Sequence, residues 1–290
     1  MFLNGLAGPL IRFTCLNHTF ELYCRGFELS NKPVRLMAIS ANKSEKAVFF
    51  ISDAHLSFAD SPSEQRLVDF IQGIKGRASH LYILGDLFDF WFEYRRAVPA
   101  SYLGILAALL RLTQSGTIVI YLPGNHDFWL GDYLTGEVGI EIAGDTLDVA
   151  HQGRKIHLIH GDGLAYGDRG YRLLKKIFRC KLNIWLYRLL PVDFAYWLAF
   201  KTSSASRAYT SSKAPDLQGY YDYAAAKLKN GYDAVIMGHT HIPEVKHIQQ
   251  GLYINTGDWI KHFSFVELKS GQFELKYFER NNASASTGNH

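Results

Sequence analysis

Short apolar runs rich in β-branched residues alternate with longer helical patterns along the first half of this chain. The first three runs are AVFFIS, HLYIL and TIVIYL, at residues 47–52, 80–84 and 117–122. Two stretches with apolar residues at helical spacing lie between them, around 63–75 and 99–115. Short apolar strands separated by amphipathic helices are typical of a layered sheet. The pattern therefore predicts an α/β fold.

Strands dominate the second half of the pattern. They are predicted at 155–160, 233–237, 252–255, 262–268 and 272–278. No internal repeat or low-complexity linker divides the chain, so we predict one domain over 47–280. Residues 1–46 show no clear period, and we interpret them as an N-terminal extension from an over-called start codon, with translation beginning at Met37. The small polar residues at 281–290 predict a disordered tail.

One connection between predicted strands is too long for a simple crossover. It spans residues 161–232, whereas a crossover helix with its loops needs a few tens of residues at most. We therefore predict an inserted helical cap at about 165–230. Its first half mixes seven Lys and Arg residues between 169 and 188 with bulky apolar residues at helical spacing. This pattern is typical of basic amphipathic helices, although such helices could also merely pad the fold.

Composition narrows the class of protein without choosing a function. The 290 residues are 48% apolar, which is ample for a buried core, and the net charge is only +4. No apolar run reaches the roughly 18 residues of a membrane-spanning helix, and the first residues do not resemble a signal peptide. The three cysteines form no CxxC pair, which favours a reducing cytosol.

Five polar motifs with metal-ligating side chains each follow an apolar run. They are Ser-Asp-Ala-His at 52–55, Gly-Asp at 85–86, Gly-Asn-His-Asp at 124–127, His160, and Gly-His-Thr-His at 238–241. Each motif alone is weak, but loops at the carboxyl ends of strands converge on one crevice, so five in order indicate a site. The candidate metal ligands are Asp53, His55, Asp86, Asn125, His160, His239 and His241.

This donor set predicts two metal ions and an anionic substrate. Asp53 and His55 stand at i and i+2, so in an extended chain they point to the same side and can share an ion. Asp86 is predicted to bridge two cations through its two oxygens. Mixed nitrogen and oxygen donors favour Mn, Fe or Zn over Mg or Ca. Two divalent ions facing only two carboxylates retain positive charge, for which phosphate is the natural partner.

In this order the motifs resemble those of the calcineurin-like metallophosphoesterase superfamily, Asp-x-His, Gly-Asp, Gly-Asn-His-Asp/Glu, His and Gly-His-x-His. The resemblance covers about 47–260 and implies a four-layer αββα sandwich with two divalent metal ions, often Mn²⁺. It implies one ion held by Asp53, His55, Asp86 and His241, and a second held by Asp86, Asn125, His160 and His239.

Within that superfamily, three segments resemble the UDP-2,3-diacylglucosamine diphosphatase family of lipid A biosynthesis. They are YILGDLFDFW, HGDGLAYGDRGY and the Ser-rich SSASRAYTSSK. The resemblance implies hydrolysis of a lipid-linked nucleotide sugar to 2,3-diacylglucosamine 1-phosphate and UMP. Two positions depart from the family pattern, since Thr210 replaces an asparagine and His126 stands where the best-known members have arginine. The implied substrate contacts are Asn125, His126, Asp168, Ser206, Lys213 and His239.

His126 and Asp89 are the predicted catalytic residues. His126 follows the candidate ligand Asn125 and is predicted to stabilise the transition state or to protonate the leaving group. Asp89 lies three residues after Asp86 and is predicted to hold that imidazole in the correct tautomer. The alternative for Asp89 is a residue that begins a helix.

The insertion gives a separate argument for a lipid substrate. Acyl chains gain about 25 cal/mol per Å² on burial, and residues 171–200 offer an apolar cap to receive them. Basic residues beside Trp185 and Trp197 fit an anionic bilayer, at about 1 kcal/mol per charge. We therefore predict a cytoplasmic enzyme peripheral to the inner membrane, with no nucleic acid and no obligate protein partner. The open alternatives are a phosphoesterase for soluble nucleotides or phosphoproteins and a non-catalytic membrane-recruitment scaffold.

Overall fold

The computed structural model describes residues 11–15, 18–22, 46–57, 62–93, 99–166, 180–192, 194–195, 197–198, 201 and 216–279. The chain divides into two compact units, Met1–Met37 and Ala38–His290. The first unit holds an antiparallel hairpin of β1 (Ile11–Cys15) and β2 (His18–Leu22), in a segment whose sequence shows no clear period. The predicted tail at 281–290 lies outside the described residues.

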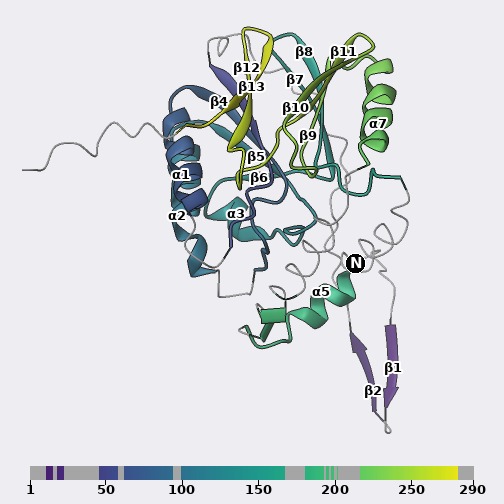
Figure 1. Ribbon diagram of the computed structural model, residues 1–290. Helices are drawn as coiled ribbons and strands as arrows, with labels where there is room; N and C mark the ends of the chain where they lie inside the picture. The colour runs from purple at the N-terminus through teal and green to yellow at the C-terminus, as the bar shows by residue number, and fades with distance from the viewer. Residues whose placement is uncertain are drawn as a thin grey trace, which may run out of the picture. The chain divides into compact units, whose positions relative to one another are not determined.

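A six-stranded sheet forms one half of the second unit, in the order β13-β12-β3-β4-β5-β6 (Figure 1). The strands from β3 to β6 run parallel, while β12 pairs antiparallel with both β3 and β13. Five of the six match predicted strands to within two residues, and the two-residue β6 was not predicted. Their bounds are β3 Ala47–Ile51, β4 Ala78–Leu84, β5 Ile118–Leu122, β6 Glu141–Ile142, β12 Ser264–Lys269 and β13 Gln272–Tyr277.

A five-stranded sheet forms the other half, in the order β10-β11-β9-β8-β7. The three central strands are parallel and were predicted, whereas the antiparallel edge strands β7 and β10 were not. Most side chains of β7 and β10 are partly or fully exposed, so neither strand presents the apolar run by which the others were recognised. The bounds are β7 Thr146–His151, β8 Arg154–Ile159, β9 Ala234–Met237, β10 Glu244–Ile248 and β11 Gly251–Asn255.

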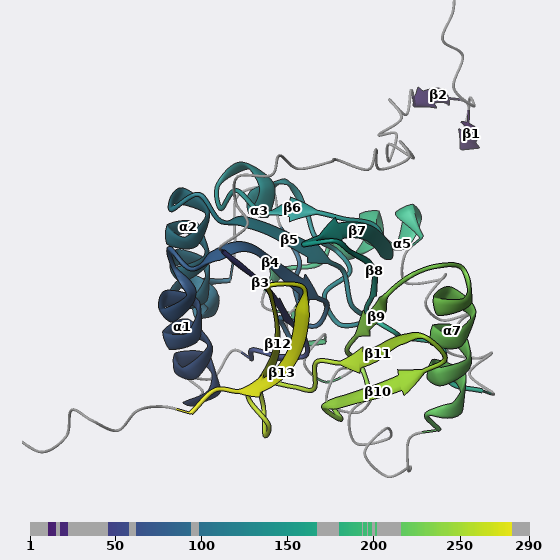
Figure 2. The same cartoon turned by 90° about the horizontal axis from the view of Figure 1, so that it is seen from above.

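Helices cover the outer face of each sheet, as the two views in Figures 1 and 2 show. Helices α1 (Pro62–Ile74) and α2 (Leu103–Gln114), with a 3-10 turn η1 (Ala100–Tyr102) before α2, pack on the six-stranded sheet. Helix α7 (Gln218–Lys229) packs on the five-stranded sheet. The short helices α3 (Asp132–Gly136) and α5 (Lys181–Tyr187) complete the described set.

The side chains of β3 point alternately to the two faces of the sheet, and each face contributes to a different core. Phe49 and Ile51 join the core under α1 and α2, whereas Val48 and Phe50 join a second core shared with Leu158 and other residues of the five-stranded sheet. Successive side chains of a strand point to opposite faces, so a strand buried on both faces must be apolar throughout. The predicted four-layer αββα architecture is confirmed.

The predicted insertion at about 165–230 has two described parts. Helix α5 falls within the predicted basic amphipathic stretch, which the structure describes only in part. Helix α7, in contrast, is the fourth layer of the sandwich and belongs to the core, with Tyr220, Ala224 and Leu228 buried against β9 and β11. Of the described helices, none has the length and apolar character needed to cross a membrane.

Candidate metal centre

The loops after β3 and β4 are joined by backbone hydrogen bonds. The amide of Asp53 donates to the carbonyl oxygen of Gly85 at 3.1 Å, and the amide of His55 donates to that of Asp86 at 2.9 Å. These bonds continue the parallel pairing of the two strands into their loops. The motif residues that follow neighbouring strands are therefore fixed side by side.

The two sheets are joined at the same edge. The amide of Gly238, which follows β9, donates to the carbonyl oxygen of His160, which follows β8, at 3.0 Å. The amide of His239 then donates to Oδ2 of Asp53 at 2.8 Å, so a residue of the five-stranded sheet's edge contacts one of the six-stranded sheet's. Four of the five sequence motifs therefore meet in one place, and the Gly-Asn-His-Asp loop joins them through Asp127.

Asp127 fixes two of these loops and has no role in the sequence prediction, although it is the last residue of the Gly-Asn-His-Asp motif. Its carboxylate is fully buried and accepts backbone N–H bonds from Asp86 at 3.2 Å, Phe88 at 3.2 Å and Gly124 at 3.0 Å. The hydroxyl of Tyr121 also donates to it. Burial and the nearby charge of Asp86 raise the pKa of Asp127 to about 6.

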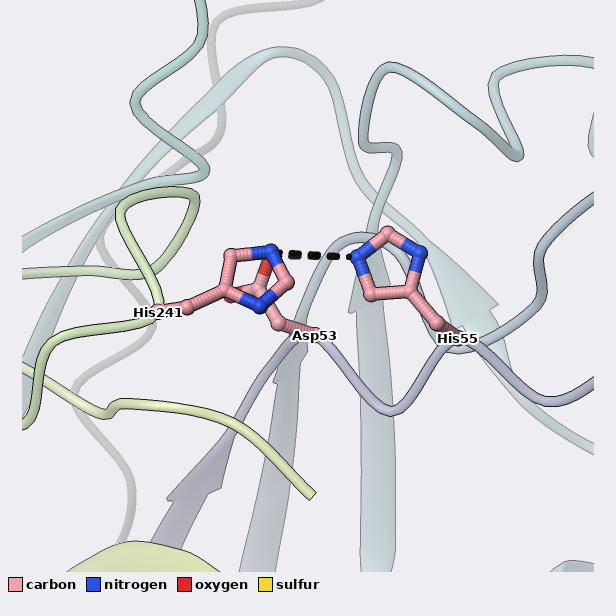
Figure 3. Close-up of side chains that lie close together, drawn as sticks. All are labelled: Asp53, His55 and His241. Atoms are coloured by element: carbon pink, nitrogen blue, oxygen red, sulfur yellow. Dashed lines mark hydrogen bonds and ion pairs between the residues drawn. The ribbon is translucent and has the colours of Figure 1, made fainter. Parts of the chain in front are cut away.

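The first group of ligating atoms comes from Asp53, His55 and His241, each offering one atom within 4.8 Å of the others (Figure 3). The Nε2 atoms of the two histidines lie 3.3 Å apart. Oδ1 of Asp53 lies 3.5 Å from Nε2 of His241 and 3.8 Å from Nε2 of His55. The three side chains thus point toward a common centre.

The second group comes from Asp86, His160 and His239. His160 donates from Nδ1 to the carbonyl oxygen of Leu84 at 2.7 Å, which turns Nε2 toward the centre of the site. Nε2 lies 3.0 Å from Oδ1 of Asn125 and 3.3 Å from Nδ1 of His239. The structure therefore brings together all seven candidate ligands.

Asp86 stands between the two groups. Its Oδ2 lies 3.4 Å from Nε2 of His160 and 3.7 Å from Nε2 of His55, while its Oδ1 accepts a hydrogen bond from the amide of His126 at 2.8 Å. The sequence predicts a bridge through both carboxylate oxygens. The structure directs one oxygen, Oδ2, toward both groups and uses the other to hold the neighbouring loop.

Electrostatics divide these groups into charged and neutral members. Burial would raise the pKa of Asp86, but the imidazoles of His160 and His126 hold it well below its usual range. Burial would lower the pKa of His160, but Asp86 and Asp53 raise it to about 10. Burial and the charge of His160 lower the pKa of His239 to about 4. The carboxylates of the site therefore already surround one positive charge, that of protonated His160, and a bound cation would take the place of that proton.

Two observations fit metal ions at this centre. Oδ1 of Asp53 is buried and has no hydrogen-bond partner among the described residues, which is costly for a carboxylate oxygen unless a cation lies beside it. The ring nitrogens of His55 and His241 lie 3.3 Å apart, and both face Oδ1 of Asp53, so the three side chains together could hold one cation.

The backbone of these loops is unusual. Nine non-glycine residues of the described chain have φ between 45° and 68°, a region that side chains disfavour. Five of them are candidate ligands: Asp53, His55, Asp86, His239 and His241. Such strain concentrates at functional sites, where the surrounding structure holds it in place.

The predicted catalytic pair is close to the first group. A carboxylate oxygen of Asp89 and ring nitrogens of His55 and His126 lie within 4.8 Å of one another. The sequence pairs Asp89 with His126, and the structure shows Asp89 accepting a hydrogen bond from Nδ1 of His55 at 3.2 Å. The rings of His55 and His126 meet edge to face, with centroids 4.9 Å apart. Asp89 thus contacts a candidate ligand.

Some predicted residues cannot be located in the described structure, and one residue of the site was not predicted. Asp168, Ser206, Thr210 and Lys213 lie outside the described residues. Asp258, for which the sequence predicts no role, is buried beside His241, with its Oδ2 3.9 Å from Nδ1 of His241. The signal that could have identified it is its place after β11, another parallel strand that ends at this edge.

In comparisons with known proteins, residues 47–243 match the family model described as calcineurin-like phosphoesterase. A Pseudomonas putida protein named UDP-2,3-diacylglucosamine hydrolase is 29% identical, over 80% of this chain and 99% of its own length. A Pseudomonas fluorescens protein of the same name is 31% identical, over 80% of this chain and 96% of its own. A solved archaeal phosphodiesterase has a TM-score of 0.42 at 14% identity, over 80% of this chain and 99% of its own.

Proposed function

Because this chain belongs to the calcineurin-like phosphoesterase family, we propose that it hydrolyses the pyrophosphate bond of UDP-2,3-diacylglucosamine, giving 2,3-diacylglucosamine 1-phosphate and UMP. The family's fold implies a two-metal centre with histidine and aspartate ligands, and the chain is a metal-dependent hydrolase. The relatives named for this substrate match it over almost their whole length, which supports the choice. The convergence of seven candidate ligands at one edge carries the proposal.

The proposed ions are Mn²⁺, held in two sets that share Asp86. Nitrogen and oxygen donors are mixed in both sets, which suits Mn²⁺ better than Mg²⁺ or Ca²⁺. When bound, the two ions supply a water of lowered pKa as the nucleophile and neutralise charge on the phosphoryl oxygens. One set would be Asp53, His55, Asp86 and His241, and the other Asp86, Asn125, His160 and His239.

Side chains of this chain would orient the substrate and move a proton. His126 lies beside both sets. Its amide donates a hydrogen bond to Asp86, and its ring contacts the ring of His55 edge to face. Its imidazole would donate to the departing phosphate oxygen, which would lower the barrier to bond cleavage. Asp89 would act one step further away, by holding the ring of His55.

An aromatic cluster next to the centre supports a lipid substrate. Tyr187, the last residue of α5, packs against Phe92 and Trp129 with ring centroids 4.8 Å apart in each case. Phe92 lies six residues after the Gly-Asp motif, and Trp129 lies two residues after the Gly-Asn-His-Asp motif. The helix that would receive acyl chains is thus fixed to the loops that carry Asp86 and Asn125.

Exposed apolar side chains near α5 support a role at a membrane surface. They are between 48% and 63% exposed and lie within or just after a sequence segment rich in Lys and Arg. They comprise Leu182, Trp185, Leu186, Leu189, Phe194 and Trp197. Apolar area of this kind gains from contact with lipid, and basic residues gain from anionic head groups. We place the enzyme at the cytoplasmic face of the inner membrane. The substrate contacts Asp168, Ser206 and Lys213 rest on resemblance alone.

Substrate class is tested with Mn²⁺-loaded protein. We expect UMP release from UDP-2,3-diacylglucosamine to exceed hydrolysis of both an aryl phosphate and a UDP-sugar without acyl chains. Equal or better hydrolysis of the unacylated compound would replace the lipid substrate with a soluble nucleotide. Full activity after exhaustive chelation would show that the reaction does not need metal ions. A His126→Ala enzyme with unchanged turnover would show that His126 takes no part in catalysis.

The membrane proposal is tested separately by co-sedimentation. Vesicles containing phosphatidylglycerol should bind the protein more strongly than phosphatidylcholine vesicles, and the paired substitution Trp185→Glu with Leu189→Glu should abolish the difference. Leu103→Glu is the matched control, because Leu103 is exposed to a similar extent, 56%, but lies on α2. Equal binding of the double variant and the control would contradict the assigned surface.

A further inference from the structure

Asp258 uses its two carboxylate oxygens differently. Oδ1 accepts backbone hydrogen bonds from Ile260 at 2.8 Å, Lys261 at 2.6 Å and His262 at 3.1 Å, which fixes the turn after β11. Oδ2 accepts from Nδ1 of His262 at 2.8 Å and lies 3.9 Å from Nδ1 of His241. The side chain is buried, so Oδ2 is held in one place beside both imidazoles.

His241 needs such support more than its neighbours do. Its side chain is 36% exposed, whereas those of Asp53 and His55 are almost fully buried. Its Nε2 faces Oδ1 of Asp53 and Nε2 of His55, so the ring presents Nδ1 to Asp258. A metal-binding imidazole that turns its second nitrogen toward a carboxylate has a fixed tautomer and a more basic ligating nitrogen.

The other candidate imidazoles show the same principle with different partners. His55 donates from Nδ1 to Asp89, and His160 donates from Nδ1 to the backbone carbonyl of Leu84. Both histidines of the first set therefore have an acidic residue behind them, whereas His160 of the second set has a neutral oxygen. The two sets are not electrostatically equivalent.

We propose that Asp258 is a positioning residue for His241, which orients its ring and strengthens binding of the ion held by Asp53, His55 and His241. The inference rests on the two-ion centre proposed above. Outer carboxylates of this kind change metal affinity by about 10- to 100-fold. The ion held by Asn125, His160 and His239 should be affected much less, because Asp258 contacts none of those side chains in the described structure.

The test is Mn²⁺ binding by calorimetric titration of Asp258→Asn. Asparagine keeps an oxygen for the three backbone amides but replaces Oδ2 with an NH2 group, which cannot accept a hydrogen bond from either imidazole. We expect two binding steps in the wild type, and in the variant a loss of about 10- to 100-fold in one step only. Ser264→Ala is the matched control, since Ser264 braces the same loop through Thr256, at 2.7 Å, without contacting the Asp258 carboxylate. The control should retain both steps.

A double-mutant cycle shows whether Asp258 acts through His241. In a His241→Gln background, Asp258→Asn should weaken Mn²⁺ binding no further. Should Asp258→Asn not fold, the wild-type protein loaded with Zn²⁺ serves instead. Its long-range proton–nitrogen NMR spectrum, assigned with His241→Gln, should show His241 protonated at Nδ1 and metal-bound at Nε2.

The outcomes separate this inference from the proposed centre. A wild type that binds fewer than two Mn²⁺ ions would overturn the two-ion centre itself. A wild type with two steps and an Asp258→Asn variant with the same two affinities would overturn only the role of Asp258. Equal weakening of both steps, or a full further loss in the His241→Gln background, would also overturn it. The opposite tautomer of His241 would do the same without any variant.

Discussion

Replacing Asp127 with alanine should be among the most destabilising single substitutions near the centre. The carboxylate is fully buried and accepts three backbone amides, those of Asp86, Phe88 and Gly124, together with the hydroxyl of Tyr121. Each buried donor left without an acceptor costs about 1 to 3 kcal/mol. The cost of burying the charge, seen in the raised pKa of Asp127, offsets part of that sum. We therefore expect Asp127→Ala to lose about 3 to 5 kcal/mol.

Asp127→Asn should lose much less, because the amide oxygen still accepts from two of the backbone amides and no charge is buried. The pKa of Asp127 rises from 3.8 in the unfolded chain to about 6 in the folded protein. The folded wild type therefore holds this proton more tightly than the unfolded chain, and its stability falls as the pH rises through that window. The asparagine variant lacks this loss, so its deficit should shrink between pH 4 and pH 6.

Urea unfolding of chelator-treated protein measures both effects. The free energies of unfolding of wild type, Asp127→Ala and Asp127→Asn are compared at pH 4.5 and at pH 7.5, with m values checked for equality. A wild-type free energy in the alanine variant would show that the carboxylate does not fix the two loops. A deficit of the asparagine variant that grows with pH would refute the electrostatic part of the reasoning.

Three further predictions use other features of the same structure. A Cβ at Gly124 would lie 2.0 Å from Oδ1 of Asp86, so Gly124→Ala should abolish Mn²⁺ binding in a calorimetric titration, whereas Gly73→Ala, with nothing within 4 Å, should bind as the wild type does. Burial lowers the pKa of His151 to about 4, so the stability that neutral His151 contributes is present above pH 6.5 and is lost as the pH falls toward 4. In urea unfolding, His151→Gln should remove about 2 to 3 kcal/mol of this loss of stability at acid pH. A variant with the same pH dependence as the wild type would contradict the prediction. The pKa of His160 is about 10, so Mn²⁺ binding at pH 7 should release at least one proton, measured by calorimetry in buffers of different ionisation enthalpy, and no release would count against His160 as a ligand.

The sequence predicts the interior of this fold better than its edges. Strands β3, β4 and β9 are buried on both faces, so they appear as unbroken apolar runs. The edge strands β7 and β10 carry mostly exposed side chains and show no such run. Helix α7 was assigned to an insertion because sequence distance alone does not reveal that its apolar face covers a sheet.

The candidate site was likewise predicted only in part from the sequence. That polar residues follow parallel strands is visible in the sequence, and it is enough to predict that Asp53, Asp86 and His160 meet. Which atom faces which partner is set by contacts between segments far apart in the chain. Asp89 hydrogen-bonds to His55, and Asp86 turns a single oxygen to both groups, because the loops are fixed by backbone bonds that no local pattern encodes.

The strained backbone of the ligands explains why those bonds are needed. A non-glycine residue in the left-handed region costs on the order of 1 to 3 kcal/mol, and five candidate ligands adopt it. Four of them have amides fixed by hydrogen bonds within the site: Asp53 to Gly85, His55 to Asp86, Asp86 to Asp127 and His239 to Asp53. These bonds would hold the donors in place before any ion arrives, so binding need not also order the loops. Glycine would relieve the strain but would remove the ligand, so at these positions the chain retains strain in order to retain the donor.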